Sequence, residues 1–297
     1  MYKEIAIVAP TASGKTALSI NLAHKTNSII LSLDSLSVYK EIDIASAKPS
    51  LKEREGIVHF GIDKIFPNEI FDVVEFIDEY KKAREYAIQN SKNLIIVGGT
   101  SFYLKSMIDG LSPCPKLTDS TKKIVKQKML DLPKVYADLV LKDNLYMNNI
   151  SSNDKYRIEK ALEIYIQTGL IPSVYFEQNK PVPIIKDINI FEIDTDVNEL
   201  RKRIKLRTNL MIKDGIIDEV ILLEKKYSRK PNCMNSIGIN ETLDYLDGKI
   251  DKKQLEEQIF VHTAQLAKRQ RTFNKSQFIG INKENLKKIE KKILTMV

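Results

Sequence analysis

The chain has 297 residues, 43% of them hydrophobic, which excludes a disordered protein and allows one large core or a core with a smaller domain. Lysine and arginine exceed aspartate and glutamate by 47 to 39, so the net charge is +8, which is compatible with nucleic acid or a polyphosphate as partner. Two cysteines without metal-ligand spacing, a strand at the very start and no apolar run near the ~18 residues of a membrane span lead us to expect a cytoplasmic protein that does not enter membranes.

Residues 5–16, Ile-Ala-Ile-Val-Ala-Pro-Thr-Ala-Ser-Gly-Lys-Thr, predict a buried strand, a phosphate-binding loop and a helix. The motif G-x-x-x-x-G-K-[ST] has Ala9 as its first residue, which fits an extended backbone and strains a turn with positive φ. Loop N–H groups and the helix dipole would hold an anion, with Lys15 on the outer phosphate oxygens and the Thr16 hydroxyl on Mg²⁺. The alternative is a plain strand-to-helix turn with a solvated Lys15. The predicted anion ligands are Ala9, Pro10, Thr11, Ala12, Ser13, Gly14, Lys15 and Thr16.

Two further strands are predicted to end beside this loop. Residues 28–33 form a βαβ unit with the first strand, so the two strands should be parallel neighbours or nearly so, and Asp34-Ser35 follows directly. A short strand near residues 59–63 and a helix over 73–87 precede the apolar run 94–97, which stops at Gly98-Gly99-Thr100. The carboxyl ends of such strands are where open α/β sheets bind ligands.

Asp34 is the candidate carboxylate of this edge. An ATPase with a phosphate-binding loop places an acidic residue after an apolar strand to organise Mg²⁺, but the run 94–97 ends in two glycines. Asp34 is therefore left with three possible roles: an outer ligand of Mg²⁺, a general base, or a cap of the following turn.

The second half of the chain reads as mainly helical. We predict an α/β core over 1–112, a mobile helical insertion over 113–182 between two proline clusters, and a return to the core with further helices over 183–297. The clearest helix of the insertion is 154–168. Later elements are a strand at 188–193, a basic amphipathic helix at 198–214, helices to about residue 274, and a solvated amphipathic tail over the last twenty or so residues.

Several motifs in a fixed order resemble one family, the bacterial tRNA dimethylallyltransferases, also called tRNA isopentenyltransferases, from residue 5 to about 274. The family's G-P-T-A-S-G-K-T resembles residues 9–16, with the first glycine replaced. The other resembling segments, in chain order, are D-S-x-Q-V-Y at 34–39, D-I-G-T-A-K-P at 43–49, H-H-L-I-D at 58–63, G-G-T-x-x-Y at 98–103, N-D-x-x-R-I-x-R-A-L-E-V at 153–164, R-I-x-x-R-x-x-x-M at 203–211 and A-K-R-Q at 267–270. The resemblance implies a sheet core like that of P-loop NTPases, with a helical insertion and a helical C-terminal region.

The resemblance also implies an activity: transfer of a dimethylallyl group from dimethylallyl diphosphate to the N6 amine of the adenosine 3′ of the anticodon, in tRNAs reading codons that start with U. The implied enzyme is a monomer that binds the anticodon stem-loop. Asp34 would be the base, and Lys15, Thr16 with Mg²⁺, and Arg203 or Arg207 would stabilise charge on the diphosphate. The implied tRNA-binding residues are Asp34, Ser35, Leu36, Ser37, Thr100, Lys122, Lys155, Arg157, Lys268 and Arg269.

Two departures bear on the grip on RNA. Ser37 stands where the family has glutamine, and residues 236–241, Ser-Ile-Gly-Ile-Asn-Glu, replace A-I-G-Y-K-E, which removes a tyrosine and a basic side chain. Other hypotheses are a small-molecule or nucleotide kinase, which does not need the helical insertion, and a non-catalytic RNA-binding protein, which leaves Lys15 and Asp34 unexplained. Within the family, the alternative is prenylation of free adenine nucleotides.

Overall fold

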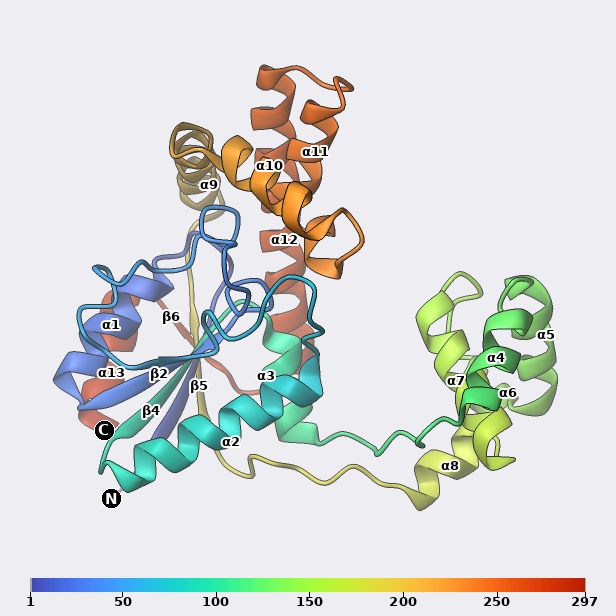
Figure 1. The fold of residues 1–297 in the computed structure, drawn as a ribbon. Helices are drawn as coiled ribbons and strands as arrows, with labels where there is room; N and C mark the ends of the chain where they lie inside the picture. Colours follow the sequence, from blue (N-terminus) through green and yellow to red (C-terminus); the bar gives the residue numbers. More distant parts are fainter. Residues whose placement is uncertain (1, 297) are drawn as a thin grey trace. The chain divides into compact units, whose positions relative to one another are not determined.

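The computed structural model describes residues 2–296. One compact unit combines the chain up to Ser106 with the chain from Ile185 onward, and it is built on a six-stranded sheet in which all neighbours are parallel (Figure 1). The strand order is β3-β2-β4-β1-β5-β6. The strands are β1 Glu4–Val8, β2 Ser28–Leu33, β3 His59–Phe60, β4 Asn93–Gly98, β5 Asn189–Ile193 and β6 Asn282–Glu284.

The centre of the sheet follows the predicted strands. β1 and β2 are parallel and are separated by β4, whose Ile96 pairs with Ala6 on one side and Leu31 on the other. The apolar stretch at 188–193 returns beside β1 as β5, as predicted. The carboxyl ends of β1, β2 and β4 therefore lie along one edge of the sheet.

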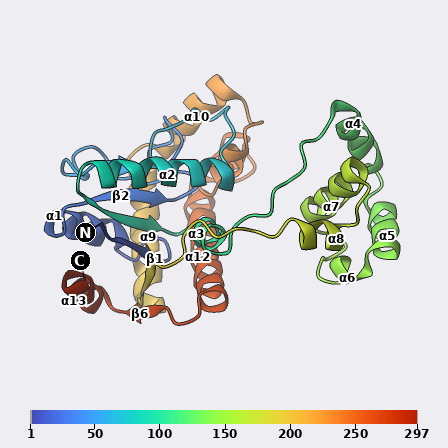
Figure 2. The same cartoon turned by 90° about the horizontal axis from the view of Figure 1, so that it is seen from below.

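Helices cover both faces of the sheet. α1 (Lys15–Lys25) and α13 (Leu286–Met296) pack on one face, and α2 (Val73–Gln89) lies on the opposite face (Figure 2). α1 buries Leu18 and Leu22 against the strands, while α2 buries Phe76 and Tyr80. Since the strands are covered on both sides, they read in the sequence as continuous apolar runs.

The end of the chain, predicted as a solvated tail, belongs to the sheet and its cover. β6 pairs with β5, and α13 buries Ile289 and Ile293 completely in the cluster that contains α1. The prediction was wrong because four lysines between residues 287 and 292 dominate the composition. The apolar residues lie three and four apart, a spacing that places them on one face of a helix.

Ile293→Ala should lower the free energy of unfolding by about 2–5 kcal/mol, because it removes a fully buried side chain and leaves a cavity between α13 and the sheet. The matched control is Leu294→Ala, whose side chain is 40% exposed and whose loss should cost less than about 1 kcal/mol. Urea unfolding followed by circular dichroism measures both. Equal midpoints for the two variants would show that α13 is not part of the core.

The second compact unit, Met107–Ile184, is helical and has its own buried apolar cluster. The insertion predicted over 113–182 falls within these bounds. The predicted helix 154–168 is α7, which begins after Asp154, whose carboxylate accepts a hydrogen bond from the Arg157 N–H, and ends at Gly169 with φ 74°. The helices of this unit are α4 Asp119–Lys128, α5 Leu132–Lys142, α6 Asn144–Met147, α7 Lys155–Thr168 and α8 Pro172–Gln178, and α3 Ser101–Asp109 leads into it.

The two ends of the helical unit are held together by backbone contacts. The Ile184 N–H donates to the Met107 carbonyl at 2.8 Å, and Leu111 pairs with Val182 in an antiparallel bridge. Gly110 lies between them with φ 83°, and a Cβ added there would meet the Val182 carbonyl oxygen at 2.4 Å. Only glycine therefore fits at this position. The two paired segments, residues 107–111 and 182–184, are here called the clasp.

The helices after β5 form a second core beside the sheet. Their buried residues pack against the segment 38–45, which follows β2. The predicted basic helix is α9, and α9 packs against the long α12. No helix among residues 2–296 is both long and apolar enough to cross a membrane. These elements are α9 Val197–Lys213, α10 Ile216–Tyr227, the 3₁₀ turn Asn232–Asn235, α11 Ile239–Leu246 and α12 Lys252–Gln277.

Candidate functional site

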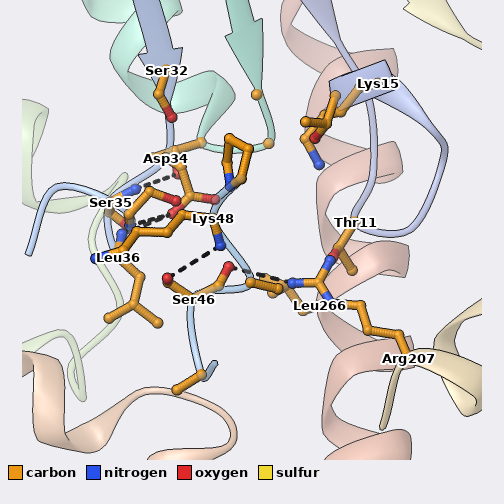
Figure 3. A pocket seen from close by; sticks show the side chains of 18 of the residues that line it. Thr11, Lys15, Ser32, Asp34, Ser35, Leu36, Ser46, Lys48, Arg207 and Leu266 are labelled. Atoms are coloured by element: carbon orange, nitrogen blue, oxygen red, sulfur yellow. Dashed lines mark hydrogen bonds between the residues drawn. The ribbon is translucent and has the colours of Figure 1, made fainter. Parts of the chain in front are cut away.

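A cavity of about 400 Å³, here called the main cavity, lies where the loops after β1, β2 and β4 meet α9 and α12 (Figure 3). One part of its wall is polar and comes from the phosphate-binding loop and the residues that follow β2 and β4. Another part is apolar and comes mainly from α9, α12 and the segments packed on them. The apolar lining residues include Leu36, Ala45, Ile204, Met211, Ile237, Ile259 and Leu266.

The loop after β1 has the backbone of an anion-binding turn. Ala9 is fully buried, its N–H donates to the Gly98 carbonyl at 3.2 Å, and it is not among the residues with positive φ. The positive φ angles fall at Ala12 (62°) and Gly14 (88°), so the missing first glycine causes no strain. Within the predicted set, Thr11, Lys15 and Thr16 line the main cavity, Ala12 and Gly14 line a neighbouring cavity of about 300 Å³, and Ala9, Pro10 and Ser13 are buried.

Lys15 occupies an electrostatically unfavourable place for a cation. Burial of its ammonium group, followed by the nearby Arg207 guanidinium, lowers the pKa of Lys15 to about 8, while Asp34 acts in the opposite direction. Lys15 is also the first residue of α1, at the positive end of the helix dipole. An anion bound at the loop would relieve all three effects, which is the property expected of a phosphate site.

Affinity for a diphosphate ester should fall about tenfold per pH unit above pH 8, because the free protein then loses the Lys15 proton and binding must restore it. The ester itself adds little to this change, since phosphate monoesters complete their ionisation near pH 6. Calorimetric titrations at pH 7, 8 and 9 measure the effect, and Lys15→Met should bind weakly with no such slope. An affinity that stays constant from pH 7 to 9 would contradict the prediction.

Two arginines of α9 reach the same loop. Arg207 donates to the Thr11 hydroxyl at 3.0 Å and to the Ser46 carbonyl at 3.4 Å, and it lines both cavities. Arg203 donates to Glu199 at 3.0 Å and to the Ser13 carbonyl at 3.4 Å, and it lines only the smaller cavity. Of the two predicted cations, Arg207 is therefore the one placed in the main cavity with Lys15.

Asp34 caps a turn and also faces the main cavity. Its Oδ1 accepts hydrogen bonds from the N–H groups of Leu36 (2.8 Å) and Ser37 (3.0 Å). Within the described chain no hydrogen bond reaches its Oδ2, and the residue lines the main cavity. The capping role thus uses one oxygen and leaves the other for chemistry. The Ser35 N–H donates to the Thr100 hydroxyl at 3.2 Å, which joins the ends of β2 and β4.

Gln270 is a site residue that the sequence interpretation overlooked. Its side-chain oxygen accepts from the Thr11 N–H at 3.0 Å, and its amide nitrogen donates to the Gly99 carbonyl at 3.1 Å. A Cβ on Gly99 would meet this amide at 2.3 Å, so the glycine makes room for the contact. The residue ends the A-K-R-Q motif, from which the sequence predicts only Lys268 and Arg269 as site residues. Those two side chains are exposed and do not line the main cavity.

The remaining predicted RNA-binding residues divide between the two units. Ser35, Leu36, Ser37 and Thr100 line the main cavity with Asp34. The other three belong to the helical unit, where Lys122 pairs with Asp119, Arg157 pairs with Asp154, and Lys155 is exposed. The structure therefore gathers the residues expected at the reacting base in one cavity, while the insertion's three cations belong to the other unit.

The main cavity offers few protein ligands for a metal. Among residues 2–296, no group of three or more His, Cys, Asp or Glu side chains is arranged to hold an ion. Thr16 contributes an exposed hydroxyl and Asp34 a free carboxylate oxygen to the same cavity. This donor set suits Mg²⁺, which keeps several waters and is held by one or two carboxylates together with substrate phosphates.

Known proteins resemble this chain along most of its length. The family model "IPP transferase" matches residues 37–277. The tRNA dimethylallyltransferase of Aliarcobacter butzleri is 60% identical over 94% of this chain and 93% of that protein, and that of Sulfurovum sp. is 52% identical over 98% and 97%.

Two solved structures are similar in fold. A tRNA delta(2)-isopentenylpyrophosphate transferase from Staphylococcus epidermidis, 30% identical, has a TM-score of 0.71 and covers 100% of this chain and 98% of that one. A eukaryotic dimethylallyltransferase described as acting on tRNA, 28% identical, has a TM-score of 0.83 and covers 96% of this chain and 74% of that one.

Proposed function

As this chain belongs to the IPP transferase family of tRNA dimethylallyltransferases, we propose that it transfers the dimethylallyl group of dimethylallyl diphosphate to the N6 amine of the adenosine 3′ of the anticodon. Membership makes the chain a prenyl-transferring enzyme of tRNA modification. The product would be N6-dimethylallyladenosine in tRNAs that read codons starting with U.

One observation carries the proposal: the main cavity combines two cations at a phosphate-binding loop, a carboxylate with one free oxygen, and an apolar part of the lining. Lys15 and Arg207 are the cations and Asp34 is the carboxylate, as Figure 3 shows. A prenyl donor needs the cations for its diphosphate and the apolar lining for its five-carbon chain. An amine acceptor needs the carboxylate. A kinase would leave the helical unit and the helices after β5 without a role.

At the donor end, the loop N–H groups, Lys15 and Arg207 would hold the diphosphate. Negative charge develops on its bridging oxygen as the bond from that oxygen to the prenyl carbon breaks. Donors fixed in place before the reaction stabilise this charge without reorganising. The apolar residues of α9 and α12 would surround the five-carbon chain and keep water away from its reacting carbon.

At the acceptor end, Asp34 would accept the proton of the adenine amine through Oδ2 while the new nitrogen–carbon bond forms. The amine is a poor nucleophile because its lone pair is shared with the ring, so removal of its proton assists the attack. The diphosphate leaves with the electron pair of the broken bond, and the proton remains on Asp34. The adenine must leave its stack to reach this depth, as in other enzymes that act on bases.

Mg²⁺ would be held by the Thr16 hydroxyl together with the diphosphate, and Asp34 lines the same cavity. When bound, the ion would add positive charge against the leaving diphosphate. Lys15 and Arg207 would act on the same leaving group, and Thr16, the second residue of α1, would contribute its hydroxyl to the ion.

The proposal is tested by incubating the protein with dimethylallyl diphosphate carrying a labelled prenyl group, together with unmodified tRNA. We expect label in RNA, at the adenosine next to the anticodon. Parallel reactions use labelled ATP and free adenosine monophosphate. Phosphoryl transfer would establish a kinase, prenylation of the free nucleotide alone would place the chain with the nucleotide-modifying relatives, and binding of tRNA without transfer would overturn the enzymatic proposal.

A further inference from the structure

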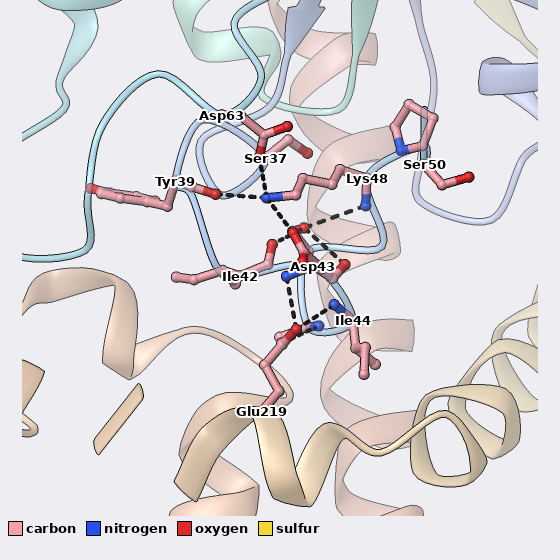
Figure 4. A network of polar contacts seen from close by, with 12 residues as sticks. Ser37, Tyr39, Ile42, Asp43, Ile44, Lys48, Ser50, Asp63 and Glu219 are labelled. Atoms are coloured by element: carbon pink, nitrogen blue, oxygen red, sulfur yellow. Dashed lines mark hydrogen bonds and ion pairs between the residues drawn. The ribbon is translucent and has the colours of Figure 1, made fainter. Parts of the chain in front are cut away.

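Glu219, in the first turn of α10, binds the backbone of a distant turn. Its carboxylate accepts hydrogen bonds from three consecutive N–H groups, those of Asp43 (2.8 Å), Ile44 (2.7 Å) and Ala45 (2.9 Å) (Figure 4). These residues open the turn 43–46, and within residues 2–296 no backbone carbonyl accepts from their N–H groups. One side chain therefore fixes the turn, in the way that a capping carboxylate fixes the start of a helix.

Lys48 holds the same turn from its other side. Its ammonium group is almost fully buried, donates to the Tyr39 carbonyl at 2.8 Å, and forms ion pairs with Asp43 (2.7 Å) and Asp63 (2.5 Å). Figure 4 shows Lys48 and Glu219 approaching the turn from different directions. Two charged side chains thus determine the position of the turn 43–46, and neither belongs to it.

The turn ends in the main cavity. Ala45 and Ser46 line it, and the Ser46 carbonyl accepts from one nitrogen of Arg207 at 3.4 Å, while the other nitrogen donates to Thr11 of the phosphate-binding loop at 3.0 Å. A continuous series of contacts therefore leads from Glu219 through the turn to the Arg207 guanidinium. The guanidinium donates one hydrogen bond to the loop and one to the turn. Displacement of the turn would therefore remove one of these two hydrogen bonds.

We propose that Glu219 is a positioning residue of the transfer reaction, which holds the turn 43–46 so that the Ser46 carbonyl orients Arg207 toward the donor diphosphate. This role rests on the proposed function, since it supposes that an anion binds at the loop. Glu219 does not touch the donor and acts only through Arg207. Its contribution should therefore disappear when Arg207 is absent.

The variant Glu219→Gln tests this role with little change of shape. The amide keeps one acceptor oxygen, but its NH₂ group would face backbone N–H groups, so part of the cluster is lost. Asp218→Asn is the matched control, because it removes the same charge from the neighbouring exposed position of the same helix turn. The probe is inorganic pyrophosphate, titrated calorimetrically into the full chain at pH 7.

We expect Glu219→Gln to weaken pyrophosphate binding about tenfold, and Asp218→Asn to leave it within about twofold. In the Arg207→Ala background, Glu219→Gln should add less than about twofold, because the two residues act as one unit. In turnover, Glu219→Gln should raise the KM for dimethylallyl diphosphate about tenfold and leave tRNA affinity unchanged. Should the glutamine variant unfold, Glu219→Asp, which keeps the charge on a shorter side chain, gives the same cycle with a smaller effect.

The outcomes separate this inference from the proposed function. The positioning role would be overturned if Glu219→Gln bound pyrophosphate as tightly as Asp218→Asn does. It would also be overturned if the losses of affinity caused by Glu219→Gln and Arg207→Ala multiplied in the double variant. Either result would leave the donor site in place. Failure of the unsubstituted protein to bind pyrophosphate would overturn both. Transfer activity with intact pyrophosphate binding in Glu219→Gln would support the proposed function and refute the role of Glu219.

Discussion

Asp34→Asn is expected to lower kcat for dimethylallyl transfer by about 10²–10⁴-fold and to leave the affinity for tRNA nearly unchanged. The asparagine oxygen can still accept from the Leu36 and Ser37 N–H groups, so the turn after β2 should persist. What is lost is the second carboxylate oxygen, the only one left to take a proton. Single-turnover rates with labelled donor measure the effect, and the unfolding temperature reports the turn.

Two controls define the meaning of this result. Asp78→Asn removes an exposed carboxylate of α2 that pairs with Lys81, and its rate should equal that of the unsubstituted protein. A Mg²⁺ titration separates the two chemical roles of Asp34: a metal ligand would be rescued by high Mg²⁺, and a general base would not. Turnover of Asp34→Asn within tenfold of normal would refute the base role.

Lys15→Met is expected to lower kcat/KM for the donor by about 10²–10³-fold, through a higher donor KM and a lower kcat together. The charge that Lys15 would place on the diphosphate is needed when the donor binds and more so when the leaving group departs. Methionine has a similar length and no charge, so it fills the same space beside the loop. Steady-state kinetics with varied donor at saturating tRNA measure both constants.

The stability of this variant distinguishes chemistry from folding. Because the ammonium group of Lys15 is buried without a direct anionic partner among the described residues, its removal should not lower the unfolding temperature. Lys25→Met, at the other end of α1, removes a surface pair with Glu290 and should leave the kinetics unchanged. Unchanged donor KM and kcat in Lys15→Met would argue against the phosphate site.

The sequence was most informative where local pattern and tertiary role agree. The apolar runs that became β1, β2 and β4 are buried on both faces, so composition alone marks them as strands. The helix over 154–168 carries its own signals, a capping Asp154 and a terminal Gly169. The prediction for the end of the chain was wrong, because the burial of this segment depends on α1 and β5, which are more than 90 residues away in sequence.

The site was predicted from motifs, and contacts made by residues without an obvious chemical role were missed. The structure brings to one cavity the predicted residues whose side-chain chemistry suits phosphate binding, proton transfer or hydrogen bonding. These residues are Lys15, Thr16, Asp34, Thr100 and Arg207. Gln270 ends the A-K-R-Q motif, but an amide on a long helix is ordinarily a surface residue, so the motif alone does not mark it as part of the site. Glu219 is likewise an unremarkable acid in a first helical turn, and only the fold shows the backbone it binds.

The backbone conformation at Ala9 could not be predicted from the sequence. Whether alanine fits the first position of the loop depends on one backbone angle, which no local pattern specifies. The structure places the positive φ angles at Ala12 and Gly14 instead. The same result leaves Ala12, rather than Ala9, as the non-glycine residue in a left-handed conformation within the loop.

The clasp at residues 107–111 and 182–184 has an evolutionary consequence. Because the Met107 carbonyl and the Ile184 N–H are bonded, the whole helical unit departs from and returns to nearly one point of the chain. A segment with adjoining ends can be acquired in a single insertion without rethreading the host sheet. The present arrangement is therefore what would result if an ancestral sheet fold had gained the helical unit in one insertion.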